Sequence, residues 1–344
     1  MADLTALLQR HEAFWRHQEV ASPLVRLQPR RDRSLLENVD VTPDMLDLEA
    51  FTPEVGIRDP GRLLVQGDLL HGECAYSRLP WTEALCGCEI HSGTGEAMWA
   101  RPTLGPDLEG LGRIVPRDDN PWLLKLLALT RALVAANDGS YVVTHTLMRG
   151  PSDMLSALVG DERMGLLFYD APERVAEVLA LCAEAFIKVA RAQYALIPAF
   201  HEGWLPWAYG LWAPGSAIRF QSDSSSQLSP RMYRAHILPH DRTIMRAFDH
   251  SILDLHSSGT LHLHGVLLDV AELDAISVTM DRFENAPTVE QLLPTFARIL
   301  EAKSLFIFGE MTMAEVELLT HSLPARGLAI SATVTDKLLW ERAL

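Results

Sequence analysis

Short apolar runs that alternate with helical segments constrain the fold of this chain more than any other feature. Eight β-prone runs lie near residues 24, 64, 142, 218, 252, 276, 305 and 329, and most are separated by segments with helical periodicity. Alternation of this kind predicts a parallel sheet with helices packed against it. Eight units in 344 residues favour a closed (β/α)8 TIM barrel over an open doubly wound sheet. We therefore expect an α/β barrel.

The first part of the chain departs from this repeat. Residues 30–62 are polar and contain Pro43, Pro53, Gly56 and Pro60, which favour irregular structure. We predict that residues 1–62 form an N-terminal elaboration and residues 63–344 form the barrel, within a single domain overall.

The stretch from Ile252 to Asp281 is the clearest strand–loop–helix–strand unit. A β-prone run ends at His256, the small turn-forming residues 257–259 follow, and a second β-prone run ends at Asp281. In a parallel barrel the carboxyl ends of the strands form the active face. We predict that His256 is catalytic and that Asp281 binds substrate; the alternatives are a surface histidine and a helix-capping aspartate.

Other polar residues follow predicted strands in the same way. Asp223, Asp68, Arg149 and Glu310 are predicted to be catalytic with His256, and His145 is predicted to bind substrate. A turn-forming role is the alternative for Asp68. If a metal ion is bound, His256 and Glu310 are the predicted nitrogen and oxygen ligands.

The segment between residues 201 and 223 is rich in aromatic residues. Trp204, Trp207 and Trp212 are predicted to line or cover the mouth of a pocket for a flat apolar ligand. Packing of the same side chains against the core is the alternative.

Composition excludes several classes of function. The formal net charge of −15 leaves no basic surface for nucleic acid. No stretch of about 20 uninterrupted apolar residues indicates a membrane span. The four cysteines do not form a disulfide framework, so we expect a cytoplasmic protein with buried thiols. No glycine-rich phosphate-binding motif follows any predicted strand.

Several segments resemble motifs of the uroporphyrinogen decarboxylase superfamily, which includes corrinoid-dependent methyltransferases, and they occur in the family's order. They are Pro80–Ala84 with Gly87-Cys88, Arg149–Asp153, Gln221–Ser224, Leu228–Pro230 with Leu238-Pro239, and Leu255–Gly259. The resemblance implies a TIM barrel that acts on a small substrate, either as a methyl transferase with a corrinoid protein as partner or as a decarboxylase.

Two departures from the family narrow this implication. Members that methylate thiols carry His-x-Cys-Gly and a later cysteine as zinc ligands, whereas this chain has His256-x-Ser258-Gly259 and no cysteine after Cys182. A thiolate-ligated zinc site is therefore not expected. The Arg-x-x-Gly-Arg motif of the decarboxylases is also absent from residues 26–33.

Three functions remain open on the sequence. The first is methyl or other one-carbon transfer, in which His256 and nearby carboxylates orient the substrate heteroatom, with or without a divalent metal. The second is metal-free decarboxylation, in which Asp223 or Asp68 stabilises a developing cation and Arg149 holds a carboxylate. The third is small-molecule binding without catalysis. His262 and His264 are further candidate metal ligands if they lie on an extended segment.

Overall fold

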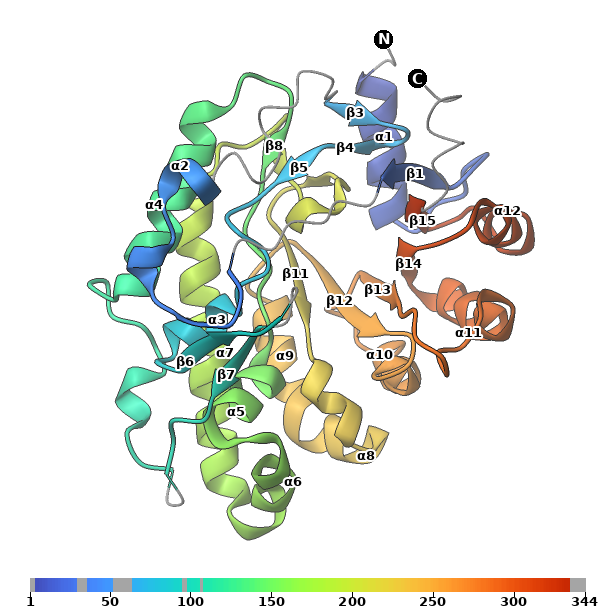
Figure 1. Cartoon of the computed structure of the whole chain (residues 1–344). Coiled ribbons are helices and arrows are strands. Elements are labelled where there is room, and N and C mark those ends of the chain that lie inside the picture. The colour runs from blue at the N-terminus through green and yellow to red at the C-terminus, as the bar shows by residue number, and fades with distance from the viewer. Residues whose placement is uncertain (1–3, 30–35, 52–63, 95–97, 106–107, 335–344) are drawn as a thin grey trace.

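A parallel sheet of six strands is the centre of the protein (Figure 1). The computed structural model describes residues 4–29, 36–51, 64–94, 98–105 and 108–334. The strand order is β1-β15-β14-β13-β12-β11, and every neighbouring pair is parallel. The strands are β1 (Leu24–Pro29), β11 (Ala217–Gln221), β12 (His250–His256), β13 (Ala275–Met280), β14 (Ser304–Glu310) and β15 (Leu328–Val334). The parallel α/β architecture predicted from the alternating pattern is confirmed.

Two further parallel strands lie next to β11. β5 (Gly72–Glu73) pairs with β8 (Val142–Val143), and a bridge between Arg149 and Gln221 joins the segment after β8 to β11. Within the described ranges, no strand ladder joins β1 to β5. The hydrogen bonds therefore define a six-stranded sheet and a two-stranded pair. β1 belongs to residues 1–62, the predicted elaboration, yet it is a full member of the larger sheet.

The prediction of a parallel strand near residue 64 is wrong. β3 (Val65–Gln66) and β4 (Leu69–Leu70) instead form an antiparallel hairpin. Gly67 makes the tight turn with φ of +60°, and a Cβ atom there would lie 2.5 Å from the carbonyl oxygen of Val25. The two-residue turn folds the run back on itself before it can join a parallel sheet. β5, which follows the hairpin, is the strand that pairs in parallel, with β8.

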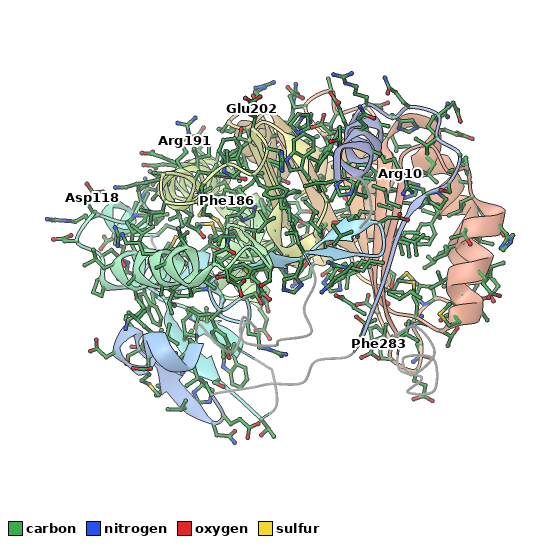
Figure 2. The ribbon with its side chains drawn as sticks, turned by 90° about the horizontal axis from the view of Figure 1, so that it is seen from above. Arg10, Asp118, Phe186, Arg191, Glu202 and Phe283 are labelled. Atoms are coloured by element: carbon green, nitrogen blue, oxygen red, sulfur yellow. The ribbon has the colours of Figure 1, made fainter. Side chains whose placement is uncertain are left out.

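Helices cover the outer face of the sheet. The longest is α7 (Pro172–Tyr194), and α9 (Leu238–Met245), α11 (Val289–Ala302) and α12 (Met313–Ser322) follow along the sheet (Figure 1). Each helix buries one apolar stripe. In Figure 2, Phe186 of α7 lies inside the molecule, 5.7 Å from the ring of Phe220, whereas Asp118, Arg191 and Glu202 lie at the surface.

The first helix closes the amino ends of the strands. α1 (Leu4–Trp15) accepts a hydrogen bond of 2.6 Å from Ser304 Oγ at the Phe14 carbonyl. The Trp15 ring lies 4.8 Å from that of His250, the first residue of β12. Residues 205–211, which we call the plug segment, pack with α1 against the inner face of the sheet. There Tyr209 stacks on Phe306 of β14, with 4.4 Å between ring centroids. The strands are thus sealed at their amino ends.

The remaining elements surround this core. They are α2 (Leu48–Phe51), α3 (Trp81–Leu85), α4 (Pro121–Ala136), α5 (Pro151–Val159), α6 (Asp161–Asp170), α8 (Pro230–Met232), α10 (His264–Leu267), the antiparallel sheet of β2 (Val39–Val41), β6 (Glu89–Ser92) and β7 (Met98–Arg101), and the hairpin of β9 (Gly203–Trp204) and β10 (Ala213–Pro214). All four cysteines are free and buried, as predicted. No helix in the described part of the chain is long and apolar enough to cross a membrane.

Candidate active site

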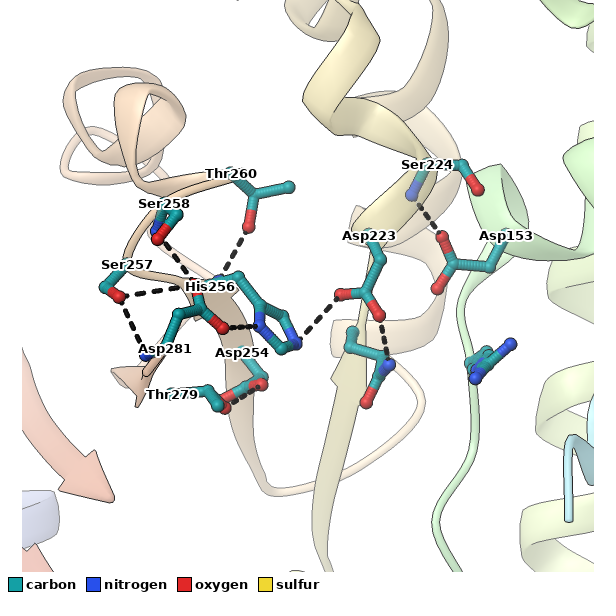
Figure 3. A network of polar contacts seen from close by, with 12 residues as sticks. Asp153, Asp223, Ser224, Asp254, His256, Ser257, Ser258, Thr260, Thr279 and Asp281 are labelled. Atoms are coloured by element: carbon teal, nitrogen blue, oxygen red, sulfur yellow. Dashed lines mark hydrogen bonds and ion pairs between the residues drawn. The ribbon is translucent and has the colours of Figure 1, made fainter. Parts of the chain in front are cut away.

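His256 ends β12 and is held by the turn that follows it (Figure 3). Its Nδ1 atom lies 2.7 Å from Oδ1 of Asp281, and its backbone N–H donates to Oγ1 of Thr260 at 2.8 Å. The other carboxylate oxygen of Asp281 accepts a bond of 2.9 Å from the backbone N–H of Ser258. The small residues that predicted a turn therefore also fix the aspartate that orients the imidazole.

A second carboxylate faces the other nitrogen of His256. Asp223 follows β11, and its Oδ1 atom lies 3.7 Å from His256 Nε2, too far for a hydrogen bond but close enough for an ion pair. Gln221 Nε2 donates to the other oxygen of Asp223 at 2.5 Å. The side chains of His256 and Asp223 are each about one third exposed, although Asp223 Oδ1, the oxygen that faces Nε2, is buried.

The charge of His256 is set by these carboxylates. Burial lowers the pKa of the imidazole, but the hydrogen bond to Asp281 and the negative charges of Asp223 and Asp254 outweigh burial and raise the pKa to about 9. At neutral pH the ring is therefore a cation. Burial would raise the pKa of Asp281, yet its bond to His256 lowers that pKa below the usual range.

Arg149 and two further acids lie on the other side of Asp223. Arg149 Nη1 lies 3.1 Å from Oε1 of Glu83, whose side chain is 1 % exposed. Asp153 accepts a bond of 2.7 Å from the backbone N–H of Ser224. Burial raises the pKa of Asp153 well above its usual range, and the charge of Asp223 raises it further. Burial also raises the pKa of Asp223 itself. The site thus holds a histidinium, an arginine and two carboxyl groups, Asp153 and Asp223, whose pKa is raised by burial.

A buried ion pair between β11 and β12 lies next to the site. Arg219 Nη2 lies 2.6 Å from Oδ2 of Asp254, and the two side chains are 2 % and 0 % exposed. Tyr209 Oη and Thr279 Oγ1 each donate to Asp254 at 2.9 Å. Arg219 also donates to Gln221 at 2.6 Å, which continues the network to Asp223.

Neither member of this ion pair was predicted from the sequence. A signal was present, because Arg219 interrupts the run Ala217–Gln221 and Asp254 interrupts the run Ile252–His256. Alternation puts Arg219 on the same face of its strand as Gln221, and Asp254 on the same face of its strand as His256, and the pairing of Gln221 with Asp254 joins the two faces.

The three tryptophans of the aromatic segment occupy different places. Trp207 belongs to the plug segment, and the guanidinium carbon of Arg219 lies 4.9 Å from its ring centroid. Trp212 donates to the Phe200 carbonyl at 2.7 Å and accepts a bond from Trp15 at its own carbonyl, so it lies with α1 at the amino ends. Trp204 donates to the carbonyl of Ile197. The prediction that Trp204 and Trp212 line the mouth is wrong, because the segment enters the sheet from its amino side.

Asp68 also lies away from His256. It accepts bonds from Arg10 at 2.5 Å and from the backbone N–H of Val25, the second residue of β1, at 3.1 Å. Asp68 therefore ties α1 and the β3–β4 hairpin to the amino end of β1. This position corrects the prediction of a strand-end carboxylate on the active face, and the cause is again the tight turn at Gly67.

Two predicted residues lie near the sheet but do not contact His256. His145 is wholly buried, its Nδ1 lies 2.7 Å from the Thr146 carbonyl, and burial lowers its pKa to about 4, so it is neutral at pH 7. Glu310 ends β14, two strands away from β12, and its carbonyl accepts a bond from Arg282.

The residues present do not fit a metal ion at this site. Among the described residues, no group of three or more His, Cys, Asp or Glu side chains could hold one. His256 and Glu310 do not converge, and Nδ1 of His256 already faces Asp281. His262 and His264 bond to main-chain carbonyls of Gly259 and Leu261, so they do not complete a ligand set.

Comparison with known proteins identifies the fold. No protein-family model matches the chain, and no curated protein matches it in sequence. Among solved structures, a methyltransferase from Methanosarcina mazei matches with a TM-score of 0.61 over 96 % of this chain and 93 % of that chain, at 13 % identity. A B12-independent methionine synthase from Shewanella sp. W3-18-1 in complex with selenomethionine matches 60 % of this chain and 59 % of that chain, with a TM-score of 0.40 and 11 % identity. The first similarity extends over nearly the whole chain and shows that the two proteins share a fold.

Proposed function

We propose that this protein is a methyl (one-carbon) transferase that acts on a small substrate at the carboxyl ends of its parallel strands. We also propose that the six-stranded sheet and the β5–β8 pair are two arcs of one (β/α)8 barrel, since eight parallel strands in this order fit that architecture. The similarity in fold to a protein described as a methyltransferase supports the reaction class. The position of His256 between the carboxyl groups of Asp281 and Asp223, which favours the protonated imidazole, is the single observation that carries the proposal.

The proposed step requires an acid at this position. The bond between the methyl carbon and the substrate heteroatom breaks, its electron pair stays on the heteroatom, and a nucleophilic acceptor supplies the pair for the new bond to carbon. The proton on Nε2 of His256 moves to the departing heteroatom, which leaves as a neutral alcohol, thiol or amine. Asp281 keeps the Nδ1 proton and the ring orientation, as a carboxylate partner does in other acid–base histidines.

We propose a corrinoid protein as the partner. A corrinoid would supply the nucleophilic methyl acceptor. Partial exposure of the site is consistent with a methyl acceptor that is carried by another protein. The side chains of His256, Asp223 and Arg149 are each about one third exposed. The described residues themselves would bind the methyl donor and move the proton.

Methyl transfer to free cob(I)alamin tests the proposal. The full chain is incubated with a panel of small O-, N- and S-methyl compounds, and the loss of cob(I)alamin absorbance is followed. We expect transfer with at least one donor class and a fall of about 10²- to 10⁴-fold in His256→Gln, the typical contribution of a general acid. No transfer from any donor, or an undiminished rate in a folded His256→Gln variant, would contradict it.

Decarboxylation is the second candidate, and Arg149 favours it. Arg149 is paired with the buried Glu83, yet about one third of its side chain is exposed. The exposed part of the guanidinium could hold a substrate carboxylate beside Asp223. Arg149→Lys would keep the charge but lose the planar fork. Release of CO2 that depends on Arg149 and not on an added methyl acceptor would favour this reaction over methyl transfer. If neither reaction is found, the remaining alternative is a binding protein.

A further inference from the structure

Two aromatic rings stay partly exposed on the inner face of the sheet. Trp207 of the plug segment and Phe308 of β14 are both half-buried, and their ring centroids are 6.1 Å apart. The rings beneath them are sealed, with Tyr209 at 1 % exposed and Phe306 at 0 %. Since α1 and the plug close the amino ends, the exposed parts of both rings face the carboxyl ends, where His256 lies.

The strand register places this aromatic surface beside His256. His256 is paired with Thr279 on β13, and Thr279 is paired with Phe308 on β14. The three side chains therefore point to the same face in one row across the sheet. Neighbouring strands are about 4.8 Å apart, so the backbone of Phe308 lies about 10 Å from that of His256. A single six-membered ring with one substituent spans this interval.

Trp207 is held in place at a conformational cost. Its backbone has φ of +60°, in the left-handed region that bulky residues rarely adopt. Arg219 lies over the indole at 4.9 Å, and the ring of Tyr209 lies 4.9 Å away. A fold that only needed to fill this space could do so with an aliphatic side chain in a relaxed conformation.

We infer that the substrate is a planar aromatic compound, such as an aryl methyl ether, whose ring lies against Trp207 and Phe308 while its heteroatom meets His256. This inference rests on the proposed methyl transfer and names its substrate class. Aromatic rings contact one another in offset or edge-to-face geometry, and such contacts discriminate a planar ring from a puckered one. Each ring contact adds about 2- to 12-fold in affinity beyond burial.

Binding of two matched ligands tests the inference. Calorimetric titration of the full chain compares methoxybenzene with methoxycyclohexane, which has the same substituent on a puckered ring. We expect methoxybenzene to bind about tenfold more tightly. Equal affinities, tighter binding of methoxycyclohexane, or no binding of either ligand would overturn it.

Two matched substitutions locate the binding surface. Phe308→Leu keeps an apolar side chain, and we expect it to reduce the preference for methoxybenzene by about 2- to 12-fold. Phe283→Leu is the control, because Phe283 is 60 % exposed on the loop after β13 (Figure 2), and it should leave the preference unchanged. An unchanged preference in folded Phe308→Leu would contradict the placement of the ring.

The binding assay separates this inference from the proposed function. Binding requires no methyl acceptor, so a preference for methoxybenzene without methyl transfer would leave the aromatic site standing and remove the proposed reaction. Methyl transfer from an aliphatic donor that depends on His256, without a preference for the planar ring, would support the proposed reaction and remove the aromatic site.

Discussion

Removing the charge of Asp281 should lower the pKa of His256. The perturbation is Asp281→Asn, which keeps the size of the side chain and one carbonyl oxygen within 2.7 Å of Nδ1. An opposite charge at this distance typically shifts a pKa by about 1–3 units. We therefore expect the value of about 9 to fall by about 1–2 units. At pH 8 the protonated fraction of His256 would fall from about nine tenths to between about one tenth and one half.

Histidine Cε1 proton signals followed by NMR against pH measure this shift. His256→Gln identifies the signal by its loss, and Asp118→Asn is the control, because Asp118 is 92 % exposed at the surface. We also expect the alkaline limb of the methyl-transfer rate to move to lower pH by the same interval, since only the protonated ring donates. A His256 pKa within about 0.3 units of the wild-type value in folded Asp281→Asn would refute the account of how the charge is set.

Three further outcomes follow from other parts of the structure. Burial raises the pKa of Asp241 to about 7, so the folded state keeps a proton on this carboxyl group that the unfolded state loses. Its contribution should lower the free energy of unfolding by up to roughly 4 kcal/mol as pH rises from about 4 to about 7. In denaturant titrations the fall should be smaller by that amount in Asp241→Asn, and an equal fall in the variant would refute the buried proton. Asp68→Asn should cost about 1 kcal/mol in the same titrations and leave methyl transfer within about twofold, because Asp68 lies at the amino end; a large loss of activity would refute its position. Arg149→Lys should weaken binding of a carboxylate-bearing ligand by about tenfold if Arg149 holds that group, and unchanged binding by calorimetry would remove this role.

The sequence predicts the parallel strands well because their signals are local. Buried parallel strands are continuous apolar runs, as in Ala275–Met280 and Ser304–Glu310, and turns end them sharply. The proximity of His256, Asp223 and Asp281 also follows, since carboxyl ends of neighbouring parallel strands meet at one edge. The hydrogen bond between His256 and Asp281 requires only that β12 and β13 are adjacent, which consecutive strands usually are.

The predictions failed where distant contacts decide the structure. The run at Leu64 has strand composition, but the turn at Gly67 packs against the carbonyl of Val25, and the sequence does not show that contact. The many aromatic residues between Trp204 and Trp212 do not show from which end of the strands this segment packs against the sheet. That direction is set by the contact of Trp212 with α1, almost 200 residues earlier. Arg219 and Asp254 were missed because their runs were judged by hydrophobicity alone, and their shared face depends on the pairing of Gln221 with Asp254, which the sequence does not show.

The central claim is that His256 gives its proton to the departing heteroatom, and one comparison tests it most directly. Methyl transfer to cob(I)alamin is measured in wild type and in His256→Gln with two donors, methoxybenzene, whose leaving group requires a proton, and methyl iodide, whose leaving group does not. The account predicts a loss of about 10²- to 10⁴-fold with methoxybenzene and little change with methyl iodide. Equal losses with both donors, or no loss with either, would contradict it.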